Sequence, residues 1–459
     1  MRPAGARRFR RAQALDGVMR TEPPGPKGVP LVGNTYHYQR DPFTFMQACR
    51  DAYGDVVKLQ LGPEEAYMLS NPETIEEILV HEADNYGKAN FGDQAVDDLL
   101  GQGMLLSEGG QWRDQRQRAQ PAFKMDRIRE LTEMMTGYAE ELTERWEGRD
   151  VVDIEEEMTT VTVRIIVEAM FGTDLPDETA RTLRTKLEPV GERFEPSISR
   201  QLIPDFVPTE ENRVYQDALK VLEGVLDDIV DQRMDDHEEG RDYLSILLRA
   251  REDGEVTDRE LRDELMTMLL AGHDTTALAL TYTWFLLAQH PEAMAELQAE
   301  LDEVCGGDPP TFEDVFQFDY TERVIQEAMR LYPPVYTLFR EPRTDVHLDG
   351  YDIPAGSALM LPQWVVHRDE RWWDDPEQFD PDRFLDERMA DRPDFAYFPF
   401  GGGPRSCIGR RFSLLEGQLI LGTVAQQYDV SLASDPDLDL QGTLTLHPRD
   451  SVELAVEPR

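Results

Sequence analysis

The sequence predicts a mainly α-helical protein with a small β region, folded as one large domain over residues 21–459. Apolar residues recur at helical spacing through most of the chain. Alternating, strand-like stretches are short and lie near the start and in the last third. The chain contains no internal repeat, low-complexity tract or clear linker, so a single domain is the most economical arrangement. Its 19 Phe, 15 Tyr and 6 Trp are enough to anchor a large core.

Each expected element follows from a local pattern. Two short strands over 56–61 and 66–69 are turned by Gly62-Pro63, and a helix begins at Pro72 and runs to Leu79. Helical spacing then covers 113–147, 151–171, 178–190, 210–235 and 242–251. Thr257 and Glu260 form a capping box that opens a long central helix ending near His290. The remaining expected segments are helices over 292–304 and 320–331, short strands within 335–365, a meander over 366–400, a helix from about 407 and strands within 427–459.

The chain is strongly acidic, with 91 Asp and Glu against 47 Lys and Arg, and a net charge of −44. A surface this negative repels phosphate backbones, so nucleic-acid binding is not expected. The chain has six lysines and 41 arginines. Excess carboxylate with little lysine is typical of proteins from extreme halophiles, and we favour that interpretation over an ordinary acidic protein because salt screens self-repulsion.

The cysteines, the N-terminal residues and the apolar stretches indicate the compartment of the protein and its relation to membranes. Cys49, Cys305 and Cys407 are too few and odd in number for a disulfide framework, which fits a reducing, cytoplasmic interior. Residues 1–20 form a basic stretch without an apolar h-region, so we expect a flexible arm and no secretion signal. The one long apolar stretch, 265–288, has charged and polar residues at its centre and is expected to be a buried helix, so no integral membrane anchor is expected.

A glycine-rich turn leads into a cysteine over residues 400–409, Phe-Gly-Gly-Gly-Pro-Arg-Ser-Cys-Ile-Gly. Three glycines and a proline form a tight turn that lets the backbone approach another group closely. Cys407 then stands at the start of a helix whose N-terminal amides stabilise an anion, so we expect a thiolate with a lowered pKa. Such a thiolate is a metal ligand or a nucleophile, and the full pattern disfavours a buried, inert cysteine.

The central helix carries an unusual run at its middle, Ala-Gly-His-Asp-Thr-Thr over 271–276. Gly272 costs about 1 kcal/mol of helix stability, and we expect it to let a bulky group lie against the helix. Asp274 beside Thr275 places an acid next to an alcohol, a pair that can pass protons inward. The alternative is that the threonines only bond back to the preceding turn.

Two further pairs share helix faces. Glu327 and Arg330 lie three residues apart and can form an ion pair. Trp112 and Arg116 lie four apart, where an indole N–H and a guanidinium could together hold a carboxylate. A surface arginine beside a packed tryptophan is the alternative for the second pair.

Taken together, these motifs resemble the cytochrome P450 family of haem-thiolate monooxygenases. The resemblance covers residues 21–459, and the motifs stand in the family's order. The matching positions are Pro23-Pro24-Gly25-Pro26, Trp112 with Arg116, Ala271-Gly272-x-Asp274-Thr275, Glu327 with Arg330 and Arg383, and Phe400, Gly403, Arg405, Cys407 and Gly409.

The resemblance implies haem b as cofactor and Cys407 as the iron ligand, with Asp274 and Thr275 as catalytic residues. Thr275 is implied to hold dioxygen by a hydrogen bond, and Asp274 to relay protons to it. The cofactor-binding residues implied are Trp112, Arg116, Ala271, Arg340, Phe400, Gly403, Arg405, Cys407 and Gly409, with Lys88 as a weaker propionate candidate. Glu327, Arg330 and Arg383 are implied to be structural.

The implied reaction inserts one oxygen atom of dioxygen into a small apolar substrate and releases the other as water. We expect a fatty acid, a terpenoid or a steroid-like molecule. Residues implied to line its pocket are Phe91, Phe194, Phe206, Ala271, Thr337 and Leu338. No flavin or nicotinamide fingerprint follows the cysteine motif, so electrons are expected from a separate ferredoxin or flavodoxin-like partner.

Three other functions stay open at this stage. The same fold could use peroxide or catalyse an isomerisation without dioxygen, although the Asp274-Thr275 pair argues against this. It could also be a non-catalytic haem sensor or carrier. A cysteine hydrolase is the fourth hypothesis, and it requires His367 or His447 as a base beside Cys407.

Overall fold

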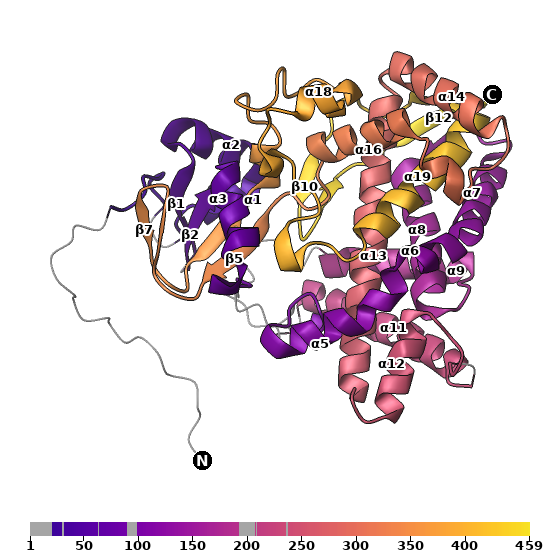
Figure 1. The fold of residues 1–459 in the computed structure, drawn as a ribbon, viewed down its shortest axis with the longest axis horizontal. Helices are drawn as coiled ribbons and strands as arrows, with labels where there is room; N and C mark the ends of the chain where they lie inside the picture. Colours follow the sequence, from indigo (N-terminus) through magenta and orange to yellow (C-terminus); the bar gives the residue numbers. More distant parts are fainter. Residues whose placement is uncertain are drawn as a thin grey trace.

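The computed structural model describes residues 21–29, 32–62, 64–89, 99–191, 207, 209–235 and 237–459. A β-rich part formed by segments from the start and the last third of the chain lies beside a larger helical part (Figure 1). This is the mainly α fold with a small β region that the sequence predicts. Phe91, Phe194 and Phe206, expected at the substrate pocket, and the basic stretch 1–20 lie outside the described residues.

The helical part surrounds one long helix, α13 (Asp258–Leu287), which crosses the molecule and is buried along most of its length (Figure 1). The predicted capping box is present, because Thr257 Oγ1 accepts from the Glu260 N–H and the Glu260 carboxylate accepts from the Thr257 N–H. Helix α8 (Ile154–Phe171) packs along α13, and α19 (Arg410–Gln427) packs between α13 and α7 (Thr132–Trp146).

The other helices are divided between the two parts, and the first three in the chain lie in the β-rich part (Figure 1). They are α1 (Thr35–Arg40), α2 (Pro42–Tyr53), α3 (Pro72–Glu76), α5 (Gly109–Ala119), α6 (Met125–Glu130), α9 (Asp177–Gly191), α11 (Glu210–Arg233), α12 (Tyr243–Glu252), α14 (Pro291–Cys305), α15 (Phe312–Val315), α16 (Asp319–Leu331), α17 (Gln363–Val366) and α18 (Asp386–Met389). Pro291 opens α14 at its first turn, as its fixed φ favours.

Two expected helices differ from the structure. The segment 113–147 is not continuous: α5, a 3₁₀ turn (Gln120–Phe123) beginning around Pro121, α6 and α7 share it. Proline removes a backbone donor there and ends α5. The helix expected over 72–79 becomes α3 followed by a π-helical turn, Glu77–His81, which carries Leu79 beneath the cysteine turn.

The β part is a five-stranded sheet of order β1-β2-β8-β5-β3. Its strands are β1 (Val56–Leu61), β2 (Glu64–Leu69), β3 (Tyr86–Gly87), β5 (Leu338–Pro342) and β8 (Ala358–Leu361). The predicted hairpin is confirmed, with β1 and β2 antiparallel and Val56 opposite Leu69. A separate hairpin pairs β6 (Val346–Leu348) with β7 (Tyr351–Ile353).

The C-terminal segment returns to the helical part. Strand β12 (Glu453–Pro458) pairs with β9 (Tyr428–Leu432) and with β4 (Val151–Asp153), which replaces the first residues of the helix expected from 151. Between β9 and β12 lies the hairpin of β10 (Leu440–Gly442) and β11 (Leu446–Pro448), in which Gln441 is opposite His447. This hairpin is one face of the site described below.

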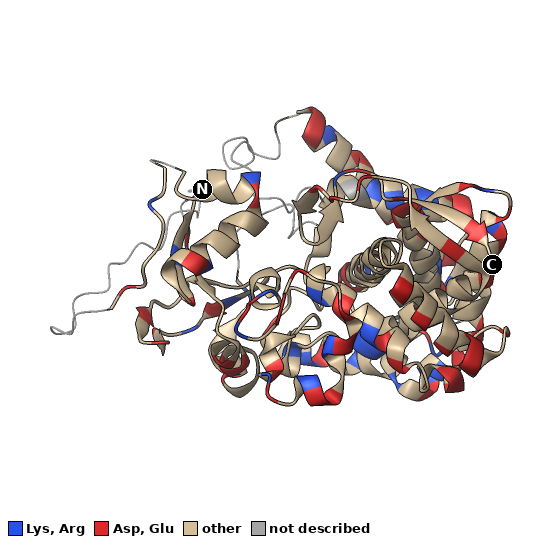
Figure 2. Cartoon of the chain, turned by 90° about the horizontal axis from the view of Figure 1, so that it is seen from above, with Lys and Arg blue, Asp and Glu red and all other residues tan. Residues whose placement is uncertain are grey.

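Charged residues of both signs are spread over the helices of the molecule, with acidic positions more numerous (Figure 2). None of the described helices, α13 included, combines the length and hydropathy that a membrane span requires.

Candidate functional site

The loop before α19 presents Cys407 through a constrained turn. Gly403 has φ +64°, and a Cβ there would stand 1.9 Å from the Leu79 carbonyl oxygen, so only glycine fits. The Cys407 N–H donates to the Phe400 carbonyl at 2.9 Å and closes the turn. The turn therefore packs against the π-helical segment at Gly403 and fixes the backbone that leads to Cys407.

The Cys407 thiol is exposed, yet protein atoms surround it closely enough that burial raises its pKa. The N–H groups of Gly409 and Arg410, and the charge of Arg116, oppose that rise. The lowered pKa expected from the sequence is therefore wrong for the thiol by itself: α19 begins three residues later, at Arg410, and burial outweighs its amides. Cys407 is therefore accessible at its surface while protein atoms pack closely around its thiol.

A cluster of cations stands beside this turn. Burial, with repulsion from Arg340 and Arg405, lowers the pKa of Lys88 to about 7. Burial and the Arg405 charge lower the pKa of Arg340 to about 10. The Arg405 guanidinium lies over the Trp112 ring and donates to the Ser107 carbonyl at 2.7 Å. The Glu108 carboxylate offsets part of this repulsion at all three cations, and like charges held this closely favour further anions between them.

The middle of α13 is partly accessible at its small residues. Ala271 is exposed although its neighbours along the helix are mostly buried. Thr275 Oγ1 donates to the Ala271 carbonyl at 3.0 Å, which is the back-bond that the alternative predicts. Thr276 Oγ1 donates to Ser413 Oγ at 3.2 Å and so links α13 to the first turn of α19, which begins three residues after Cys407.

Gly272 has a different role from the one expected. A Cβ on Gly272 would meet Ile166 Cγ1 at 2.5 Å and Cδ1 at 2.7 Å, both on α8. The bulky group against the helix is therefore a neighbouring side chain, and the glycine allows α8 and α13 to approach closely. Residue spacing does not say which face of a helix a glycine occupies, so this contact lay beyond the sequence.

These residues fit a haem. Among the described residues no group of three or more His, Cys, Asp or Glu side chains could hold a bare metal ion. Cys407 accordingly offers one protein ligand, as an iron carried in a macrocycle requires. The clustered cations Lys88, Arg340 and Arg405 suit two propionate carboxylates.

The model of the family "Cytochrome P450" matches residues 23–454. The chain belongs to the cytochrome P450 family. As a cytochrome P450, it is an oxidoreductase with a haem-thiolate cofactor, a haem-dependent monooxygenase that inserts oxygen from dioxygen into an apolar substrate with electrons from a redox partner.

Its similarity to characterised P450 enzymes extends over almost the whole chain. It is 36% identical to cyclooctatin synthase of Streptomyces melanosporofaciens, over 94% of this chain and 93% of that protein. It is 33% identical to cyclooctat-9-en-7-ol 5-monooxygenase of the same organism, over 88% of each chain. It is 31% identical to pentalenene oxygenase of Streptomyces avermitilis, over 92% of this chain and 95% of that protein.

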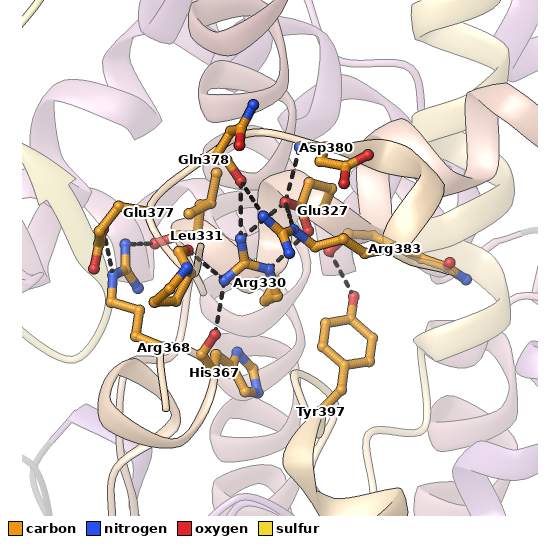
Figure 3. A network of polar contacts seen from close by, with 12 residues as sticks. Glu327, Arg330, Leu331, His367, Arg368, Glu377, Gln378, Asp380, Arg383 and Tyr397 are labelled. Atoms are coloured by element: carbon orange, nitrogen blue, oxygen red, sulfur yellow. Dashed lines mark hydrogen bonds and ion pairs between the residues drawn. The ribbon is translucent and has the colours of Figure 1, made fainter. Parts of the chain in front are cut away.

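A buried ion-pair network links α16 to the segment that precedes Cys407 in the chain (Figure 3). Glu327 accepts from Arg330 Nε at 2.7 Å and from Arg383 Nε at 3.2 Å, and all three side chains are at most 2% exposed. Arg330 also donates to the carbonyls of His367 and Pro376. The structural role expected for this triad is confirmed, because it ties α16 to the meander before Cys407.

Neither histidine proposed as a hydrolase base has that role. His367 is buried and accepts the Phe398 N–H at Nε2, while burial and the nearby arginines lower its pKa well below its usual value. His447 pairs with Asp274 and Glu155. The charged groups that act on Cys407 are instead the arginines Arg116 and Arg410.

The surroundings of Asp274 were not foreseen. Asp274 Oδ2 accepts from Thr445 Oγ1 at 2.6 Å and lies 3.4 Å from His447 Nε2, while His447 Nδ1 lies 3.1 Å from Glu155 Oε1. The three partners come from β11, the turn before it and the start of α8. No short motif encodes such a set, because Glu155 and His447 are 292 positions apart.

Of the residues expected to line the pocket, Thr337 is buried and Leu338, at the start of β5, is half-buried. Phe400 is half-buried, and the Arg410 guanidinium lies over its ring. A Cβ on Gly409 would be 3.8 Å from Cys407 Sγ. The structure thus brings Phe400, Gly403, Arg405, Cys407 and Gly409 together in one turn.

Proposed function

We propose that this P450 binds haem b, that Cys407 would hold its iron, and that residues 21–459 form the haem domain. The observation that carries the proposal is the accessible Cys407 at the end of the constrained glycine turn, where the charge of Arg116 acts on its thiol. Arg116, Arg340, Arg405 and Trp112, with Lys88, would hold the propionates, and Gly403, Phe400 and Gly409 would shape the turn beneath the ring. When bound, haem supplies the redox-active iron at which dioxygen is cleaved.

The chain's own residues would then supply hydrogen bonds and protons. The Thr275 hydroxyl has a single proton, which it now donates to the Ala271 carbonyl, so it would turn away from that carbonyl to donate to dioxygen. Asp274, on the adjacent position of α13, would move protons toward it. The close α8–α13 packing at Gly272 supports this arrangement, because it fixes α13 where these two side chains project.

We infer that the substrate is a terpenoid hydrocarbon or alcohol. The support is the similarity to relatives named for cyclooctat-9-en-7-ol and pentalenene. A fatty acid and a steroid are the competing classes. The electron donor is proposed to be a separate ferredoxin or flavodoxin-like protein, and the enzyme to be a soluble cytoplasmic protein of microbial type whose −44 charge is adapted to high salt.

Two spectra test this proposal. The reduced, CO-treated protein should show the red-shifted Soret band of thiolate ligation, and Cys407→Ser should lose it. Terpenoids should shift the spin state of the ferric enzyme more strongly than fatty acids or steroids of equal size. A protein that binds haem without the thiolate band would contradict the ligand assignment, and no spin shift with any class would favour a haem sensor or carrier.

Thr275→Ala distinguishes the monooxygenase from the peroxide-using or isomerase alternative. The variant should consume reducing equivalents while forming less product, because it no longer positions dioxygen. Unchanged coupling between the two would favour the alternative.

A further inference from the structure

A continuous polar chain connects the middle of α13 to the start of α8. His447 Nε2 lies 3.0 Å from Thr445 Oγ1, which donates to Asp274 Oδ2 at 2.6 Å. The other ring nitrogen, Nδ1, lies 3.1 Å from Glu155 Oε1. Each of these separations is within hydrogen-bond reach, so a proton can pass from the imidazole to Asp274 through one hydroxyl.

Fixed backbone holds both ends of this chain. Tyr282, on α13 two turns after Asp274, donates its hydroxyl to the Leu446 carbonyl at 2.7 Å, and the Leu446 N–H donates to the Pro334 carbonyl at 2.9 Å. The start of α8 is tied by the Ile154 N–H, which donates to the Val452 carbonyl at 2.9 Å. Groups on anchored strands and helices keep their mutual geometry better than groups on free loops.

The side chains along the path are partly accessible. Glu155 retains 20% of its side-chain surface, His447 28% and Asp274 20%. A path with accessible members at both ends can exchange protons with water at one end and deliver them at the other. Arg184, which is near the same turn of α8, pairs with Glu156 and not with Glu155.

The charges around His447 favour its protonated form. Asp274 and Glu155 raise its pKa to about 10 against the effect of burial, and His447 in turn holds the pKa of Asp274 well below its usual value. His273, one residue before Asp274, is buried with a lowered pKa and repels His447 weakly. The Tyr282 phenol faces Glu155 and Asp274, which raise its pKa further. His447 and Asp274 titrate as a pair that keeps one proton through the neutral range.

We propose that His447, held by Glu155, is the positioning residue that returns protons to Asp274 through Thr445 Oγ1 in each catalytic cycle. The inference rests on the proton-donating role proposed for Asp274. In the resting pair His447 holds the proton and Asp274 is a carboxylate. The Nε2 proton passes to Thr445 Oγ1 as the Thr445 hydroxyl proton passes to Asp274, which delivers it toward dioxygen and returns to the carboxylate. The neutral His447 then regains one proton from water, so one proton enters for each one delivered.

Four variants test the inference in the full holoenzyme. His447→Gln keeps hydrogen bonding but carries no proton, Thr445→Val removes the connecting hydroxyl, and Asp274→Asn removes the acid. His347→Gln is the matched control, because His347 pairs with Asp352 at 2.9 Å in the β6–β7 hairpin, an equivalent pair outside the site. The CO-reduced spectrum of each variant reports whether the thiolate site has folded.

The main readout is the pH profile of product formed per reducing equivalent. His447→Gln should lose about tenfold near neutral pH, less than the roughly 10²-fold expected of Asp274→Asn. The loss should shrink as pH falls, because burial without the imidazolium raises the Asp274 pKa and lets water protonate it. Thr445→Val should behave in the same direction, and His347→Gln should match the parent.

A second readout does not depend on turnover. In the reduced, CO-bound enzyme, ¹⁵N-labelled histidine should show His447 still doubly protonated at neutral pH, and Glu155→Gln should lower its pKa. A His447→Gln enzyme with the parent's profile, or an equal loss at every pH, would overturn the inference while Asp274→Asn remains impaired. An unimpaired Asp274→Asn would instead overturn the proposed role of Asp274, and the inference with it.

Discussion

Gly272 of α13 lies against Ile166 of α8 so closely that a Cβ on the glycine would be 2.5 Å from Ile166 Cγ1. The contact sets the distance between the two helices that pack most extensively in the helical part. It also fixes α13 next to Asp274 and Thr275. The first prediction follows from it.

Gly272→Ala should destabilise the fold by about 1–3 kcal/mol, because the added methyl overpacks a rigid contact. Adding Ile166→Ala should recover part of the loss in a double-mutant cycle, since it removes the atoms that clash. Urea unfolding followed by circular dichroism measures both. Gly137→Ala, in α7 with open space around it, is the control and should be neutral or stabilising.

Glu327→Ala should cost about 3–5 kcal/mol, because it leaves Arg330 and Arg383 buried without their carboxylate. The unfolding midpoint in urea checks the value. Glu178 and Arg181, three residues apart on α9, are both exposed. Glu178→Ala therefore removes a carboxylate of the same spacing at the surface and should change stability by no more than about 0.5 kcal/mol. Equal losses in the two variants would contradict the buried-network account.

Arg405→Ala should speed haem loss by roughly tenfold to 100-fold, since a charge-assisted hydrogen bond is worth about 1.5–3 kcal/mol. Transfer of haem to an apo-acceptor protein, followed by absorbance, gives the rate. Arg129→Ala, on exposed α6 and paired with Glu313, is the control for lost positive charge. A rate of haem loss equal to that of the parent would show that Arg405 does not bind the cofactor.

The pH dependence of stability carries a signature of His447. Its folded pKa of about 10 exceeds the ordinary 6.5, so its contribution is complete below pH 6.5 and declines as the pH rises toward 10. His447→Gln should therefore show a smaller loss of stability across that window than the parent. Thermal unfolding at matched ionic strength measures this difference, and parallel curves would show that the imidazolium is not stabilised in the fold.

Potassium chloride should raise the melting temperature, because salt screens the repulsion of a chain with a net charge of −44. Sorbitol at equal osmolality is the control for exclusion of solutes from the surface. A melting temperature that falls or stays constant between low and molar salt would contradict the halophilic interpretation of the composition.

Most of the fold was accessible to sequence reasoning because long helices such as α13 show their spacing directly. The Cys407 turn was equally accessible, since its glycines, Arg405 and the thiol are adjacent in the chain. The partners of Asp274 were not, because periodicity and spacing describe one segment at a time. His447 was considered only as a base for Cys407, and the topology of the C-terminal hairpin is what brings it to α13 instead.

The sheet of β4, β9 and β12 joins the strand before α8 to residues 300 to 304 positions later. Contacts of such high sequence separation form only after large loops have closed, and they are the slow part of folding. Preparations that are refolded or expressed too quickly would then contain molecules in which the helices have formed but the strands β4, β9 and β12 have not yet paired. Product assays of such preparations would underestimate the enzyme, and slow annealing before assay should restore the missing fraction.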